Sequence, residues 1–135
     1  SICTAYAEAI EADTVYHGSA LIDSQAGYWD GSMEFIEAIN GVNALNRRNR
    51  VKIVAPLITK SKQDIIQLGI DNNVDFDDTW TCYEGKEHAC GQCPACSARI
   101  KGFADAGYID PLKYSIDIPW DKLTGPTGGK LIEIK

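Results

Sequence analysis

Residues 82–96 read CYEGKEHACGQCPAC, and their four cysteines follow the spacing Cys82-x7-Cys90-x2-Cys93-x2-Cys96. Zinc binds four thiolates in a tetrahedron, and two overlapping Cys-x2-Cys pairs can supply three of those ligands from one tight turn. Gly91 permits the sharp bend that such a turn needs. The spacing therefore predicts a four-cysteine zinc site. Because four cysteines leave no open coordination position, its role is expected to be structural.

Two other chemistries fit the same four cysteines. Three closely spaced cysteines and a more distant one can hold an iron–sulfur cluster. Disulfides are the second alternative, but the sequence carries no sign of secretion, and clustered cysteines are then more typical of metal ligands. The fifth cysteine, Cys3, stands apart among apolar neighbours and is expected to be a small buried side chain.

The sequence on either side of the cysteines predicts alternating helices and strands. A helix is expected from Pro94 to Ala106, where Cys96 lies in the first turn and Gly107 fits a left-handed cap. Upstream, helices are expected over residues 3–11, 33–46 and 61–72, and strands over 14–18 and 51–56. Ser32 can cap the second of these helices, and Ser61 followed by Asp64 resembles a capping box at the start of the third. This alternation is typical of α/β proteins with parallel strands. The connection at 19–31 is expected to be a long functional loop.

Composition and net charge argue against several classes of protein. The chain has 135 residues, 44% of them apolar and 24% charged, which indicates a globular domain with a real core. No apolar run approaches the roughly 18 residues of a membrane span. The net charge of −6 opposes non-specific nucleic-acid binding. One basic cluster is expected to be a solvated helix end rather than a phosphate site, and it comprises Arg47, Arg48, Arg50 and Lys52.

Changes in residue composition and pattern along the chain predict three parts. We expect an α/β part over residues 1–73, a metal-binding knuckle with its helix over 74–111, and a C-terminal tail over 112–135. Within the tail, residues 131–134 alternate like a short strand.

Several segments together resemble one known family. They are Thr79-Trp80-Thr81-Cys82-Tyr83, the run from Ala89 to Phe103, Ala55-Pro56-Leu57-Ile58-Thr59-Lys60, Gly27-Tyr28-Trp29-Asp30 and Glu34-Phe35-Ile36. Over residues 1–111 the chain resembles the C-terminal half of the 7-cyano-7-deazaguanine synthase family of queuosine-precursor biosynthesis. The cysteine knuckle with Arg99 and Gly102-Phe103 is the most specific part of this resemblance.

The resemblance implies a fold, an activity and partners. The implied fold is α/β, a partial parallel sheet of the Rossmann-like PP-loop ATPase kind with a four-cysteine zinc knuckle. The implied reaction converts 7-carboxy-7-deazaguanine and ammonia to 7-cyano-7-deazaguanine, with ATP and Mg²⁺ in the complete enzyme. First the carboxylate is adenylated and ammonia displaces AMP, and then a second ATP drives dehydration to the nitrile. Members of the family are expected to be cytoplasmic homodimers with a structural Zn²⁺.

The chain departs from the family pattern at the ATP site. The family's Ser-Gly-Gly-x-Asp-Ser loop has no counterpart here, since the only Gly-Gly pair, Gly128-Gly129, lies at the wrong end. We therefore expect a fragment that is inactive alone, with the loop upstream of Ser1. The strand end His17-Gly18-Ser19-Ala20 also differs from the family's Gly-x-Asn, and the family's Cys-Arg pair after Asp30 is replaced.

Six residues outside the cysteine cluster are candidates for contacts with substrate or nucleotide. Four of them follow the first predicted strand, at the end where open α/β sheets bind ligands, and they are Gly18, Asp23, Tyr28 and Asp30. Asp23 or Asp30 could accept hydrogen bonds from the exocyclic amine of a deazapurine. Lys60 could contact phosphate or carboxylate. Arg99 could reach an anionic substrate or pair with nearby acids.

Two further functions remain open at this point. A non-catalytic zinc-ribbon module would explain the cysteines, although a ribbon needs no α/β core. A PP-loop enzyme that thiolates tRNA is the other alternative, and the acidic net charge disfavours it.

Overall fold

The computed structural model describes residues 2–46, 48 and 50–134, and its contacts divide the chain into two compact units. The first unit comprises residues 1–60 and the second residues 61–135. This boundary lies before the helix at 62–71, whereas the sequence predicts a boundary after that helix, at residue 73. The difference arises because this helix packs against the helix that follows the cysteines.

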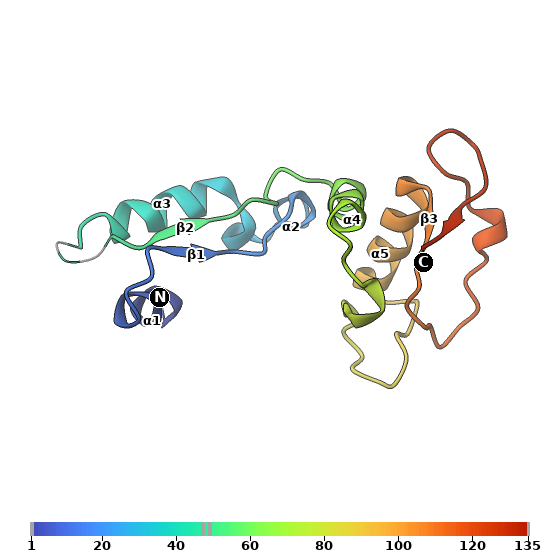
Figure 1. Cartoon of the computed structure of the whole chain (residues 1–135), viewed down its shortest axis with the longest axis horizontal. Coiled ribbons are helices and arrows are strands. Elements are labelled where there is room, and N and C mark those ends of the chain that lie inside the picture. Colours follow the sequence, from blue (N-terminus) through green and yellow to red (C-terminus); the bar gives the residue numbers. More distant parts are fainter. Residues whose placement is uncertain (1, 47, 49, 135) are drawn as a thin grey trace. The chain divides into compact units, whose positions relative to one another are not determined.

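The first unit is built on two parallel strands, β1 (Thr14–Tyr16) and β2 (Lys52–Val54), with Val15 opposite Ile53. Helix α3 (Met33–Asn43) lies along this ribbon in Figure 1, and its N-terminus is capped by Ser32, as the sequence predicts. The core of the unit is formed by Ile36, Ile53 and Ile58. The predicted parallel pairing is therefore confirmed, with strands shorter than expected.

Asn40 of α3 closes the edge of β2 that faces away from β1. Its Nδ2 donates to the carbonyl oxygen of Ile53 and its Oδ1 accepts from the Ile53 N–H, both at 2.8 Å. Lys52 donates to Asp13 and Val54 accepts from His17 on the β1 side. One side chain thus satisfies both backbone groups that the two-stranded ladder leaves unpaired at Ile53.

The segment 19–31 is not a structureless loop, which corrects the sequence-based expectation. It contains helix α2 (Leu21–Gln25) and the 3₁₀ turn η1 (Trp29–Gly31). The Asp23 carboxylate accepts a hydrogen bond from the Ala20 N–H at 2.8 Å, which satisfies a backbone group at the start of α2. A helix of five residues is too short to show apolar periodicity in the sequence.

Helix α1 (Ile2–Ala9) turns Thr4 and Ala7 inward, so Cys3 is exposed rather than buried as expected. In the basic cluster Arg48, Arg50 and Lys52 are exposed, in agreement with a solvated segment. Arg47 lies outside the described residues. No helix in the described part of the chain has the length and apolar character needed to cross a membrane.

The second unit is centred on two packed helices, α4 (Lys62–Asp71) and α5 (Pro94–Ala106). The predicted capping box at the start of α4 is confirmed, because Ser61 and Asp64 exchange side-chain and backbone hydrogen bonds. At the end of α5, Gly107 adopts the predicted left-handed conformation, with φ of 88°. Ile66, Phe76 and Phe103 form the core.

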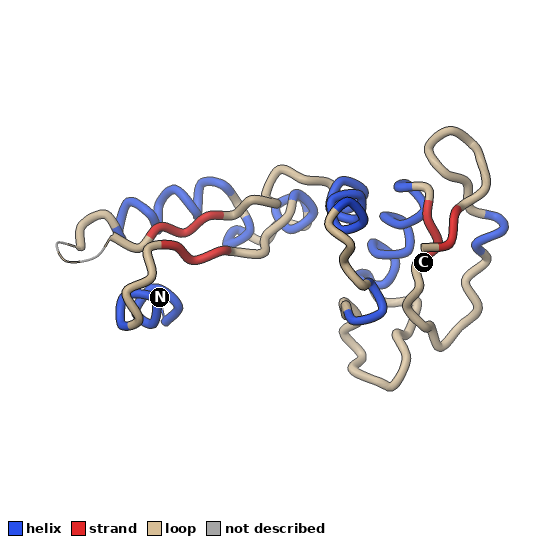
Figure 2. Tube along the Cα trace, in the orientation of Figure 1, coloured by secondary structure: helices blue, strands red, loops and turns tan. Residues whose placement is uncertain are grey.

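Short elements complete the second unit (Figure 2). The 3₁₀ turn η2 (Phe76–Asp78) precedes the cysteine region, and the 3₁₀ turn η3 (Trp120–Lys122) lies within the tail. Strand β3 (Tyr108–Ile109) pairs in parallel with β4 (Ile132–Glu133), which confirms the short strand predicted in the tail. Trp120 and Ile134 pack against the core, so the tail belongs to this unit.

Gly69 of α4 allows Phe76 to enter the core. A Cβ added at Gly69 would lie 2.5 Å from the Phe76 Cζ, and that ring stacks edge-on against Phe103. We expect Gly69→Ala to lower the free energy of unfolding by about 1–3 kcal/mol, because overpacking displaces the ring. Thermal and denaturant unfolding measure the effect.

The matched control is Gly41→Ala on α3, where an added Cβ meets no atom within 4 Å. Alanine should stabilise this helix by about 0.5–1 kcal/mol, since it has the higher helix propensity. A stabilising Gly69→Ala substitution would show that the α4 glycine is not needed for packing.

Candidate metal centre

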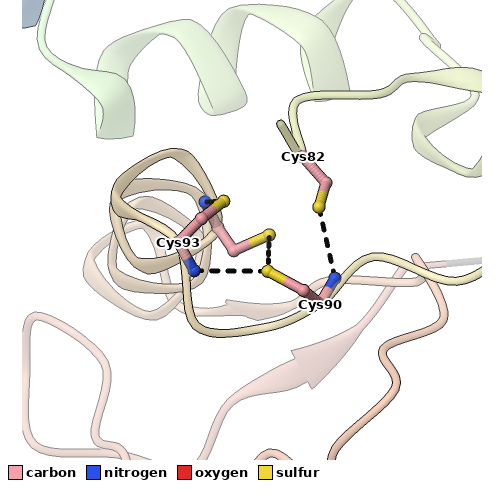
Figure 3. Close-up of side chains that lie close together, drawn as sticks. Cys82, Cys90 and Cys93 are labelled. Atoms are coloured by element: carbon pink, nitrogen blue, oxygen red, sulfur yellow. Dashed lines mark hydrogen bonds between the residues drawn. The ribbon is translucent and has the colours of Figure 1, made fainter. Parts of the chain in front are cut away.

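The sulfur atoms of Cys82, Cys90, Cys93 and Cys96 all lie within 4.8 Å of one another. Figure 3 shows this convergence, and the Sγ atoms of Cys90 and Cys96 are 3.9 Å apart. A tetrahedron with Zn–S bonds of about 2.3 Å places its sulfurs about 3.8 Å apart. None of the four cysteines forms a disulfide. The predicted cluster is thus assembled as a group that could hold a metal ion such as zinc.

The backbone around the cluster supplies N–H groups to the sulfurs. Cys82 Sγ accepts from the N–H groups of Glu84 (3.4 Å) and Cys90 (3.3 Å). Cys90 Sγ accepts from Gln92 (3.4 Å) and Cys93 (3.3 Å), while Cys93 Sγ accepts from Cys96 (3.4 Å). Hydrogen bonds of this kind favour a thiolate over a thiol, so they suit a site that binds a cation.

The thiols differ in acidity because their surroundings differ. N–H groups of Tyr83 and Cys96 lower the pKa of Cys93 to about 6. The N–H of Cys90 makes the largest contribution to lowering the pKa of Cys82. Burial dominates at Cys96 and raises its pKa to about 12. Cys96 therefore needs a cation nearby to ionise at neutral pH.

Local structure explains the position of each ligand. Cys93 is the N-cap of α5 and Cys96 lies in its first turn, after Pro94 at the first helical position. Gly91, with φ of 74°, makes the predicted bend, and a Cβ there would lie 2.6 Å from the Ile116 side chain. Only glycine fits this position without displacing Ile116.

Arg99 is paired with Asp110 in the interior next to the cysteines. Its Nε and Nη2 donate to the two carboxylate oxygens at 2.5 and 2.8 Å. Nη2 also donates to the Phe76 carbonyl, and Nη1 donates to the carbonyl and the hydroxyl of Thr79. Arg99 is 3% exposed, and these bonds engage all five of its N–H donors. Of the two roles left open by the sequence, the observed contacts are those of an ion pair.

Three of the other candidates meet in the first unit. Asp23, Tyr28 and Asp30 line a hollow of about 200 Å³ together with Ser19 and Gly31. Gly18 and Lys60 are exposed and do not line this hollow. The hollow therefore gathers two carboxylates, which can accept hydrogen bonds from a ligand rich in N–H groups.

Sequence reasoning missed Ser19, Asp110 and Tyr114. Ser19 is buried, and its Oγ lies 2.7 Å from His17 Nδ1. The sequence feature that could have identified Ser19 is its position directly after the first predicted strand. The Tyr114 hydroxyl donates to Asp110 Oδ2 at 2.6 Å, and both burial and this bond raise the pKa of Tyr114 far above its usual range. No local pattern marks this partnership.

We expect zinc binding at pH 7.5 to release fewer than four protons per chain. Cys93, with a pKa of about 6, is already ionised, whereas Cys96, with a pKa of about 12, must lose its proton to the solvent. The affinity of the chain for zinc should also fall as pH falls, because protons compete with the metal for the sulfur atoms. Titration of the metal-free chain in weak buffer with an indicator dye counts the protons. Release of four would contradict the acidity of Cys93, and release of none would contradict the thiol state of Cys96.

Comparisons with known proteins agree with the resemblance. The family model described as "Queuosine biosynthesis protein QueC" matches residues 1–107. The chain is 42% identical over 114 residues to the 7-cyano-7-deazaguanine synthase of Marinomonas sp., covering 84% of the chain and 52% of that protein. For the synthase of Thermoplasma volcanium the identity is 43% over 119 residues, covering 85% of the chain and 49% of that protein.

A third synthase, from Oceanobacillus iheyensis, is 44% identical over 116 residues, covering 84% of the chain and 52% of that protein. The chain thus spans about half the length of the curated relatives it matches. The family model covers the whole of the first unit and the whole cysteine cluster. By this match, together with the assembled cysteines, the chain belongs to the queuosine biosynthesis protein QueC family.

Proposed function

We propose that the chain is part of an ATP-dependent carbon–nitrogen ligase that makes 7-cyano-7-deazaguanine from 7-carboxy-7-deazaguanine and ammonia. The observation that carries the proposal is the family match over residues 1–107, supported by relatives named 7-cyano-7-deazaguanine synthase. No observation on the described residues favours a zinc-ribbon module or a tRNA-thiolating enzyme.

The four cysteines would hold a structural Zn²⁺ in this enzyme. Support comes from the sulfur separations, from the backbone N–H groups that face the thiolates, and from the four-cysteine donor set, which leaves no coordination position for a reacting ligand. When bound, the ion supplies a cross-link between the segment at Cys82 and the start of α5. Its contribution would be to folding of the second unit rather than to bond making.

The hollow in the first unit would receive the deazapurine. Asp23 and Asp30 would accept hydrogen bonds from its exocyclic amine and ring N–H, and exposed Tyr28 offers an aromatic face. Gly18 and exposed Lys60 would contribute at the ends of their strands, Lys60 as a positive charge toward phosphate or carboxylate. Arg99 is left out of this set, because all of its donors are engaged within the second unit.

The proposal extends to the complete protein. Its fold would be of the Rossmann-like PP-loop ATPase kind, which the parallel pairing of β1 and β2 supports. ATP and Mg²⁺ would be held mainly by a PP-loop, a motif that these 135 residues do not contain. The assembly would be a homodimer in the cytoplasm.

We expect one zinc ion per chain by elemental analysis, because four thiolates within 4.8 Å match the coordination that zinc prefers. Cys90→Ser should lower the occupancy severely, whereas Cys3→Ser, at an exposed cysteine outside the cluster, should leave it unchanged. Iron in place of zinc, or a brown chromophore, would overturn the assignment of the metal.

The chain alone should release no AMP from ATP in the presence of 7-carboxy-7-deazaguanine and ammonia, because it contains no PP-loop. Joined to the half of the Marinomonas sp. synthase that it does not match, it should support nitrile formation, measured by mass spectrometry. In that chimera Asp23→Asn should reduce turnover about tenfold, the effect of a lost charge-assisted hydrogen bond.

The control in the chimera is Glu37→Gln, an exposed acid on α3 that does not line the hollow. Its turnover should match that of the unmodified chimera. A folded, zinc-loaded chimera without nitrile formation would refute the proposed activity for this chain. Equal turnover in Asp23→Asn would instead remove the hollow from the substrate site.

A further inference from the structure

We propose that Arg99 and Asp110 are positioning residues for the metal centre, because their buried ion pair connects the separate segments that carry the cysteines. The inference rests on the zinc site proposed above. Neither residue contacts a sulfur in the hydrogen-bond network, so both would act through the backbone that carries the ligands. The side chains of Arg99 and Asp110 are 4% and 0% exposed.

The first connection leads from Arg99 to the segment of Cys82. Arg99 Nη1 donates to the Thr79 carbonyl at 3.0 Å and to its hydroxyl at 2.8 Å. Thr79 lies three residues before Cys82, and the intervening Trp80 donates its Nε1–H to the Cys82 carbonyl at 2.9 Å. The guanidinium and the indole thus hold the backbone of a ligand that is separated from the other three by seven residues.

The second connection leads from Asp110 to the segment of Cys90. Asp110 accepts from the Leu112 N–H at 3.0 Å and from the Tyr114 hydroxyl at 2.6 Å. Tyr114 lies opposite Ala89 in a parallel bridge, in which Ala89 donates to Lys113 and accepts from Ser115. Ala89 is fully buried and directly precedes Cys90. The carboxylate thereby holds the strand-like segment on which Cys90 depends.

The third connection runs through α5 itself. Arg99 lies three residues after Cys96, so the two share a face of the helix. The guanidinium also lies 5.4 Å from the centre of the Phe103 ring, which anchors the same helix in the core. One ion pair therefore meets the Cys82 segment, the Cys90 segment and the helix of Cys93 and Cys96. This arrangement differs from a salt bridge that stabilises one element only.

Binding of Co²⁺ to the 135-residue chain tests the inference, because cobalt reports both affinity and coordination geometry. Arg99→Lys keeps the positive charge but cannot form the five hydrogen bonds of the guanidinium. We expect its Co²⁺ dissociation constant, measured against a competing chelator, to rise about tenfold or more, as for other residues that orient metal ligands. The visible ligand-field bands of the bound Co²⁺ should change as well.

Two further variants make the result specific. Tyr114→Phe leaves the ion pair in place and removes one bond to Asp110, so its affinity should lie between those of the wild type and Arg99→Lys. Lys101→Met breaks the exposed pair with Asp105 on the same helix, where the side chains are 74% and 44% exposed. Its affinity and spectrum should equal those of the wild type.

The outcomes separate this inference from the zinc site on which it rests. A wild-type chain without thiolate-to-cobalt charge transfer would overturn the metal site and the positioning role with it. Wild-type affinity and spectrum in Arg99→Lys, despite a lower melting temperature, would show that the pair only stabilises the core. If Arg99→Lys does not fold, Tyr114→Phe decides: weakened affinity supports the inference, and unchanged affinity overturns it.

Discussion

The arrangement of segments in the second unit depends on the buried positive charge of Arg99. A guanidinium removed from water costs several kcal/mol unless its charge and all of its donors are satisfied. Asp110 neutralises the charge, and the carbonyls of Phe76 and Thr79 complete the set together with the Thr79 hydroxyl. These partners lie up to 23 residues away, so the requirement brings distant segments together. Loss of Asp110 alone would leave an uncompensated charge in the core, at a cost of about 3–5 kcal/mol.

The cysteine cluster and the ion pair both connect segments of the second unit that are distant along the chain. One buried apolar cluster of the second unit is formed by Ile66, Phe76 and Phe103, and the other includes the cysteines themselves, with Cys82, Ala89 and Cys96. A structural metal adds folding free energy where the apolar core is limited. The cysteines can supply this cross-link at the start of α5, and the Arg99 network holds the same segments through hydrogen bonds further along the helix.

The first unit relies on a helix to stabilise a very small sheet. A two-stranded sheet is marginal in water, and β1 and β2 each have only three residues. Helix α3 contributes the core side chain Ile36, and its Asn40 bonds both backbone groups of Ile53. Packing and edge closure therefore come from the same helix. The hollow with Asp23 and Asp30 depends on the backbone that follows β1.

The sequence by itself determined the features that depend on residues close together along the chain. The spacing from Cys82 to Cys96, the cap of α4 at Ser61 and the cap of α5 at Gly107 are set by local backbone geometry, and the structure confirms them. Tertiary structure alone decided which distant groups meet. The pairing of Arg99 with Asp110 and of Asn40 with Ile53 satisfies buried polar groups through partners 11 and 13 residues away, and no periodicity records such a requirement.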